Sequence, residues 1–156
     1  MARAAIQDPM KVFRFRVVID GFVRFGFSEA SGLSKETAVV EYREGGMNET
    51  PQKSAGLTTY GDITLKRGQY DPSLPGANDF LNWVNQVHRV AVMGNAEQYR
   101  KDIEIEQYNA VNQRVRSWKV SHAWPKSHKA FGDLNATSND NSLEELVLAH
   151  EGFELA

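Results

Sequence analysis

Hydrophobic and polar residues alternate along most of this 156-residue chain, with the period of two that a half-buried β-strand shows. In residues 12–19 one face carries only apolar side chains, whereas the other face carries both arginines of the segment: the apolar face is Phe13, Phe15, Val17 and Ile19. The Asp20-Gly21 pair that follows tolerates positive φ and is a strong hairpin signal. Residues 22–27, "FVRFGF", are therefore predicted as the partner strand.

The same alternation predicts further strands over residues 35–44, 62–68, 101–107 and 115–125. In the last of these, four large side chains share one face: Trp118, Val120, His122 and Trp124. Residues 143–155 fit either a helix or a strand by spacing, and the glycine at position 152 favours a strand.

One segment changes period, because four apolar residues recur at the spacing of a single helical stripe: Phe80, Trp83, Val84 and Val87. This pattern predicts a helix over residues 78–91, with Asn78 as its N-cap and Gly94 just after its end. We therefore expect a mainly β protein, an antiparallel barrel or sandwich of about seven or eight strands with one flanking helix. The length suits a single domain over residues 1–156.

Residues 43–60 interrupt the regular pattern between two predicted strands. The segment is rich in glycine, contains a proline and has few large apolar side chains. Hairpin loops need two to about five residues, and a much longer bare connection in a compact domain usually serves a function. We expect a long inter-strand arm here.

Composition narrows the function classes. The formal net charge is −2, from 18 basic and 20 acidic side chains that are interspersed, so no basic patch indicates nucleic-acid binding. The lack of cysteine excludes disulfides, thiol nucleophiles and cysteine-type zinc sites. No stretch approaches the ~20 apolar residues of a membrane helix, and the N-terminal region lacks a signal-peptide core, so we expect folding in the bacterial cytoplasm.

No motif predicts catalysis or a cofactor. Residues 133–144 place oxygen-bearing side chains at the ligand positions of a calcium loop, but Ser138 stands where the sharp turn needs glycine, so no metal is expected. The histidines lack metal-ligand spacing and are interpreted as interface or surface residues: His88, His122, His128 and His150. Acidic pairs such as Glu144/Glu145 are not placed across a cleft by anything in the sequence.

Several predicted strands are apolar on both faces. Val39 lies opposite Val40, and Val147 lies opposite Leu146 and Leu148. An antiparallel sheet in a monomer normally leaves one face polar, and a single helix covers little of it. The surplus of apolar positions on these strands favours self-assembly, although a closed barrel with a covered flank would show the same pattern.

Five blocks of sequence resemble the tube proteins of contractile phage tails and phage-tail-like injection systems. They are "FSEASGLSKETAVVEYREGG" (residues 27–46), "YGDITLKRG", "FLNWV", "HAWPKS" and "LNATSNDNSLEELVLAHEGFE". The resemblance runs from about Met10 to the C-terminus and is greatest to inner tube subunits of extracellular contractile injection systems of the antifeeding-prophage and Photorhabdus-cassette type.

The resemblance implies a non-enzymatic structural subunit that forms hexameric rings. Such rings stack into a hollow conduit, which sheath contraction drives through a target envelope. The implied partners are further copies of the chain, a sheath protein, baseplate and tube-initiator proteins, and cargo effectors in the lumen. The implied location after assembly is a phage-tail-like particle.

In proteins of this kind the long arm crosses the junction between stacked rings. The candidate stacking residues are Arg43, Glu44, Gly45, Gly46, Met47, Asn48, Glu49, Pro51, Gly56, Leu57 and Tyr60. Strand alternation adds candidate lumen-facing residues: Thr64, Lys66, Glu104 and Glu106.

Three alternatives stay open at this point. One is a tube-initiator paralogue at the baseplate of the same kind of particle. The others belong to different classes, a monomeric ligand-binding β-barrel and a small hydrolase with paired carboxylates. Cargo and target cell are not specified by the sequence.

Overall fold

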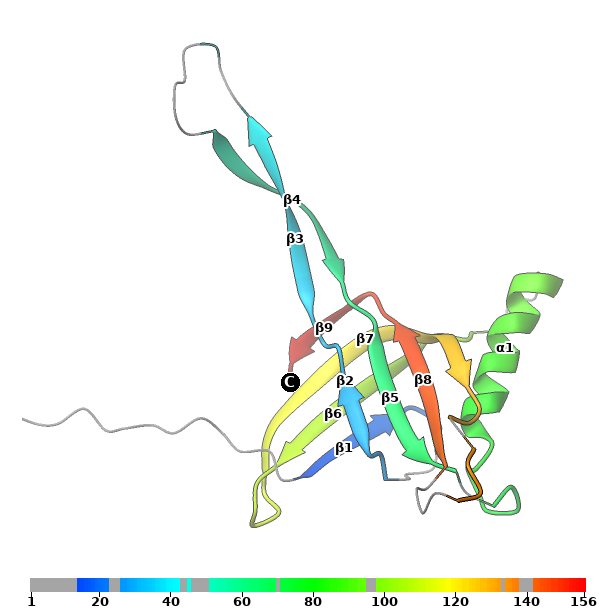
Figure 1. Ribbon diagram of the computed structural model, residues 1–156. Coiled ribbons are helices and arrows are strands. Elements are labelled where there is room, and N and C mark those ends of the chain that lie inside the picture. The colour runs from blue at the N-terminus through cyan, green and yellow to red at the C-terminus, as the bar shows by residue number, and fades with distance from the viewer. Residues whose placement is uncertain are drawn as a thin grey trace, which may run out of the picture.

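A computed structural model of the chain describes residues 14–22, 26–42, 45, 51–69, 71–94, 98–132, 134–137 and 142–156. These residues form nine strands and one helix: β1 (Arg14–Ile19), β2 (Glu29–Ser31), β3 (Lys35–Tyr42), β4 (Gln52–Tyr60), β5 (Ile63–Gly68), α1 (Asp79–Met93), β6 (Lys101–Tyr108), β7 (Arg114–Lys129), β8 (Leu143–Ala149) and β9 (Gly152–Leu155). The predicted fold class is confirmed, because the protein is mainly β, its strands pair antiparallel and one helix lies at its flank (Figure 1).

Seven strands form one sheet that turns back on itself along β7. Hydrogen-bonded neighbours follow the order β1-β6-β7-β8-β5-β2, and β9 also pairs with β7. Residues 114–120 and Ala123 of β7 pair with β6, whereas residues 124–129 pair with β8. The two ends of one long strand thus belong to two facing halves of the sheet.

A bulge separates these two ends of β7. His122 has a φ of 53°, and the pairing with β6 shifts register beside it. Because of the extra residue, the side chains beyond the bulge point to the opposite face from the one that strict alternation predicts. Trp118 and Val120 face the core as expected, but Ala123 continues the buried face, and the prediction that His122 and Trp124 share it was wrong.

One apolar core lies between the two halves. It comprises Val17, Ile19, Ile63, Leu65, Phe80, Trp83, Ile103, Ile105, Val120, Ala123, Leu146 and Leu148, all of them buried. Each of the strands β1, β5, β6 and β8 contributes two of these residues at alternate positions, which is the period that the sequence showed.

Residues 22–27 do not form the predicted partner of β1, at least in their described positions 22, 26 and 27. β1 pairs instead with β6, far along the chain. The rings of Phe22 and Phe27 pack against Phe80 of α1 at centroid distances of 6.0 and 5.7 Å. Phe22 and Phe27 therefore pack against the core and α1 rather than continuing the sheet.

The helix predicted over 78–91 is α1, Asp79–Met93. Gly94 ends it in the left-handed conformation with φ 66°, and its N–H donates to Val90 O at 3.1 Å. Asn78 makes no capping hydrogen bond with its side chain, contrary to the prediction. Its amide donates to Pro72 O instead, at 3.5 Å.

A buried arginine anchors the segment that leads into α1. Arg67 on β5 is only 2% exposed, and its Nε donates to Glu144 Oε2 at 3.1 Å. Its Nη2 donates to Ala77 O at 2.8 Å, and its guanidinium lies 4.0 Å from the ring centroid of Phe80. His128 Nε2 lies 2.7 Å from the second oxygen of Glu144. This cluster ties three strands to the segment that leads into the helix.

The cluster corrects two sequence interpretations. His128 is a largely buried partner of Glu144, not a surface histidine. Glu144, the last position of the calcium-loop pattern, is engaged by Arg67 and His128. Positions 133 and 138–141 of that pattern lie outside the described residues.

β3 and β4 form a separate two-stranded hairpin, here called the arm, that projects from the body of the domain (Figure 1). The prediction of a bare connection over 43–60 was wrong for residues 52–60, which pair with β3 from Tyr42↔Gln52 to Lys35↔Tyr60. The residues of β3 and most of those of β4 are exposed. A strand with no buried face need not alternate, so the sequence pattern did not reveal β4.

Candidate assembly surfaces

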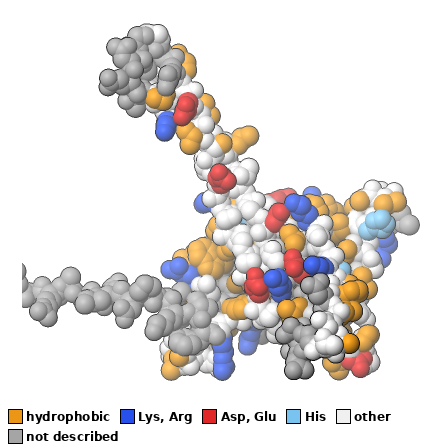
Figure 2. Space-filling view, viewed as in Figure 1, with side chains coloured by type: hydrophobic (Ala, Val, Ile, Leu, Met, Phe, Trp, Pro, Cys, Tyr) orange, Lys and Arg blue, Asp and Glu red, His pale blue; other side chains and the backbone are white. Residues whose placement is uncertain are grey.

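The arm presents large apolar side chains to solvent on both of its faces. Val39 and Val40 are 61% and 52% exposed and point in opposite directions because they are consecutive in a strand. Tyr42 and Leu57 are also exposed. Hydrophobic side chains are visible along the arm in Figure 2. An isolated two-stranded hairpin is marginally stable in water, and exposed apolar surface is typical of interaction sites, so the arm is a candidate contact surface.

A bulge lies in the middle of the arm, next to Leu57. The pairing shifts register between Thr37 and Val39, where β4 carries the extra residue. A Cβ on Gly56 would lie 3.1 Å from both Ala38 O and a methyl of Val40, so glycine permits the close approach of the two strands. Leu57 next to it is 82% exposed.

The base of the arm is fixed to the body by aromatic contacts. The ring of Tyr60 lies 5.9 Å from that of Phe153 and 5.7 Å from that of His150. His150 Nε2 lies 2.8 Å from Gly61 O. Gly32, with φ +92°, passes so close to Asp62 that a Cβ would lie 2.2 Å from the Asp62 carbonyl oxygen. These contacts set the direction in which the arm leaves the domain.

The predicted stacking residues fall into three groups. Six of them lie outside the described residues: Arg43, Glu44, Gly46, Met47, Asn48 and Glu49. Gly45, Pro51, Gly56 and Leu57 belong to the arm beyond its base. Tyr60 is at the base and packs within its own chain. Val39, Val40 and Tyr42, which the predicted set omitted, are the exposed apolar residues of β3.

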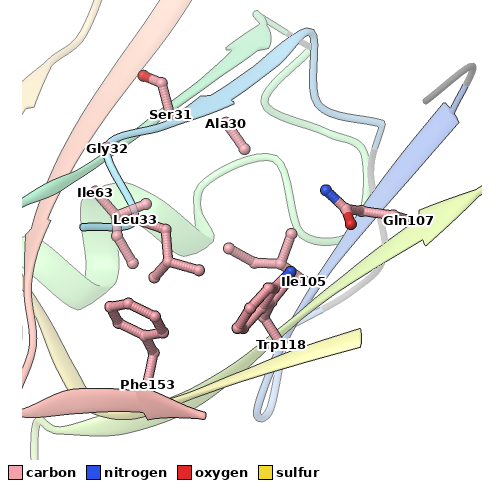
Figure 3. A pocket seen from close by; sticks show the side chains of 9 residues that line it. All are labelled: Ala30, Ser31, Gly32, Leu33, Ile63, Ile105, Gln107, Trp118 and Phe153. Atoms are coloured by element: carbon pink, nitrogen blue, oxygen red, sulfur yellow. The ribbon is translucent and has the colours of Figure 1, made fainter. Parts of the chain in front are cut away.

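The four predicted lumen-facing residues do not share one surface. Ile63 of β5 and Ile105 of β6 line the same internal cavity, so these two strands face each other across the core (Figure 3). Side chains alternate along each strand, so Thr64 and Lys66 point outward from one half of the sheet. Glu104 and Glu106 point outward from the other half. The two pairs therefore lie on different outward faces of the folded sheet.

The outward face of β6 carries a network of charges. Arg114 Nη1 lies 3.6 Å from Glu104 Oε1 and 3.7 Å from Glu106 Oε1. Ser117 Oγ donates to Glu104 Oε1 at 2.6 Å. Tyr108 donates its hydroxyl hydrogen to Glu106, and this hydrogen bond to a carboxylate raises the pKa of the Tyr108 hydroxyl above its usual value. These contacts make the outward face of β6 polar.

Lys66 on the other half pairs with Glu29, Nζ to Oε2 at 3.2 Å. Across the described part of the chain, no three histidine, aspartate or glutamate side chains are arranged to hold a metal ion. Of the described segments, none forms a helix with the length and hydrophobicity needed to cross a membrane.

Known proteins and one protein family are similar to this chain. The sequence-family model described as "T4-like virus tail tube protein gp19" matches residues 11–154. No curated protein matches the chain significantly. Among solved structures, a chain of the anti-feeding prophage cap, described as the tube-terminating cap, is 29% identical with a TM-score of 0.80 over 99% of this chain and 95% of that one.

Two further structures extend the comparison. A chain of the sheath-tube complex of an extracellular contractile injection system (PVC) in its extended state is 26% identical, with a TM-score of 0.77 over 97% of this chain and 93% of that one. Hcp1 from Flavobacterium johnsoniae is 14% identical with a TM-score of 0.54, covering 92% and 94% of the two chains, and shows likeness of fold alone.

Proposed function

The chain belongs to the T4-like tail tube protein family, and from this membership we propose that it is the repeating subunit of the inner tube of a contractile injection particle. Hexameric rings of the chain stack into a hollow conduit, which sheath contraction drives through a target envelope. The subunit itself performs no chemistry. Its partners are further copies of itself, the sheath protein, and the baseplate and initiator proteins.

One observation carries this proposal beyond family membership: the arm exposes apolar residues on both faces and stands clear of its own domain. A contact made only in the assembly explains why these side chains lack cover within the chain. We place the arm across the junction between stacked rings. Because this head-to-tail contact does not close on itself, it propagates along the tube, whereas the contact within a ring closes by rotation.

The channel wall is one outward face of the folded sheet, either that of Thr64 and Lys66 or that of Glu104 and Glu106. Both faces are polar and carry paired charges, which suits a surface past which cargo effectors slide. Assembly of the subunits takes place in the bacterial cytoplasm before the particle acts.

Negative-stain electron microscopy of the purified protein over a concentration series tests the assignment. We expect rings with a central hole that stack into tubes as the concentration rises. The variant Val39→Ser/Val40→Ser should fold normally, because both side chains are exposed in the lone subunit, and should fail to form tubes. Val92→Ser makes the same chemical change at a 67% exposed site on α1 and serves as the control for loss of apolar surface. Tubes of normal length from the double variant would contradict the role of the arm.

A second candidate function is a subunit that ends the tube. The similarity to chains in structures of an anti-feeding prophage cap and baseplate favours it. An end protein forms rings that bind a tube but do not stack on one another. The concentration series separates the two functions, because only the repeating subunit extends into tubes by itself.

A further inference from the structure

One half of the folded sheet carries a row of alternating charges on its outward face. Four strand segments contribute one residue each, and every residue of the row lies directly opposite the next one in the register of the paired strands. In order from β2 through β5 and β8 to the end of β7, the row consists of Glu29, Lys66, Glu145 and Lys129. The neighbouring Leu65 and Leu146 are buried in the core, so the row points outward. Figure 2 shows acidic and basic side chains that alternate across this face of the body.

The row ends at two strand edges that have no partner among the described strands. β2 pairs with β5 alone, and residues 124–129 of β7 pair with β8 alone. The Glu29 side chain at the first edge is 49% exposed. Lys129 at the second edge is exposed and forms no ion pair within the described part of the chain. The two edges therefore present single charges of opposite sign.

The helix does not cover the charge at the second edge. His128 lines a pocket together with Leu81 of α1, so the helix lies on the inner side of this end of β7. Lys129 is the next residue of the strand and points to the opposite side. Its ammonium group is thus open to a neighbouring molecule.

We infer that the β2 edge of one copy of the chain lies beside the 124–129 edge of the next copy, with Glu29 paired to Lys129 of the neighbouring copy. Charge complementarity favours this head-to-tail arrangement. Two β2 edges would place Glu29 against Glu29, and like charges directly opposite each other are destabilising. A head-to-tail contact closes into a ring by rotation, and the alternation of charge then continues around the ring. The inference rests on the proposed function, since it assigns the contact within a ring.

The outward face of the other half of the sheet does not offer such a match. Across β1, β6, β7 and β9, the row that ends at Glu154 begins at the uncharged Val18. The row that begins at Arg16 reaches Ser117. Among the described strands, only the row from Glu29 to Lys129 has side chains of opposite charge at its two edges.

Charge reversal at each end of the row, followed by mixing, tests the contact. Glu29→Lys gives a chain with a basic residue at both edges, and Lys129→Glu gives a chain with an acidic residue at both. Each variant alone should need a roughly tenfold higher concentration than the natural chain to form rings, because like charges meet at every interface. An equal mixture should form rings again, since each contact between the two kinds of chain is complementary. Size-exclusion chromatography with light scattering measures ring formation, and native mass spectrometry counts the two chains in each ring.

The matched control is Lys119→Glu, which makes the same change directly opposite a carboxylate, that of Glu104, but inside a row of the other half. This variant should form rings like the natural chain. Reversed chains that assemble as well as the control would overturn the inference, and so would folded reversed chains that fail both alone and when mixed. Either result would leave the proposed function standing, whereas a natural chain that forms neither rings nor tubes contradicts both.

Neutral variants keep the test decisive if a reversed chain does not fold. Glu29→Gln and Lys129→Gln each remove one charge, and each should raise the concentration needed for ring formation about two- to fivefold. The double variant should cost no more than either single change, because one and the same pair is lost. Within one chain the two positions are three strand spacings apart, roughly 14 Å, so coupling between them arises between chains. Independent, multiplying effects of the two changes would show that the residues do not meet.

Discussion

Replacing the buried Arg67 with methionine tests what holds the domain together. The side chain links β5 to Glu144 on β8, to the carbonyl oxygen of Ala77 before α1 and to the ring of Phe80. Methionine keeps an apolar stem of similar length but removes every donor. Glu144, which is 8% exposed, then loses its arginine partner. His128 is the partner that remains among the described residues.

The expected cost follows from that burial. Removing one partner of a buried ion pair costs about 3–5 kcal/mol, because the remaining charge stays out of water without compensation. For a domain of this size each kcal/mol lowers the melting temperature by about 2–4 °C, so the predicted decrease is roughly 6–20 °C. The control is Lys66→Met on the neighbouring position. Its pair with Glu29 is 31% and 49% exposed, and such surface pairs contribute about 0–1 kcal/mol.

Urea denaturation followed by tryptophan fluorescence measures both changes. The free energy of unfolding is compared in the Val39→Ser/Val40→Ser background, which should form no tubes, and at one fixed protein concentration, since assembly raises apparent stability by mass action. Arg67→Met should lose at least three times as much free energy as Lys66→Met. Equal losses of under 1 kcal/mol in both would refute the view that the buried cluster anchors α1 to the sheet.

Two further predictions concern single sites. Gly32→Ala should lower the free energy of unfolding by about 1–3 kcal/mol and change the direction of the arm, because φ is +92° and the added Cβ would lie 2.2 Å from Asp62 O. The control in the thermal melt is Gly26→Ala, which should change little because an added Cβ there has no atom within 4 Å. The raised pKa of Tyr108 means that its hydrogen bond to Glu106 stabilises the fold below the unfolded value of about 10 and is lost as pH rises through the folded-state pKa. An ultraviolet difference titration against Tyr108→Phe should show that pKa falling in Glu106→Gln, and an unchanged value would contradict the assigned cause.

The sequence alone determined the elements that bury one face within the chain. Alternation identified β1, β5 and β6, and helical spacing identified α1, because each of these patterns records contact with the core of the same molecule. The spacing left the segment of β8 open between helix and strand, and the glycine at position 152 favoured a strand. The similarity of several blocks to tube proteins indicated the family before any geometry was known. The apolar residues on both faces of β3 favoured self-assembly, and this stays a prediction.

Only the tertiary structure decided how these elements combine. The pairing of β1 with β6 depends on residues about 90 positions apart, and no local pattern specifies it. β4 was missed because its sequence is mostly small or polar and shows no alternation of apolar residues. The phase change at His122 depends on one residue in a left-handed conformation. Burial of Arg67 is likewise set by side chains that meet across the folded sheet. The sequence shows which faces of its strands and helix are buried, and only the fold determines which residues bury them.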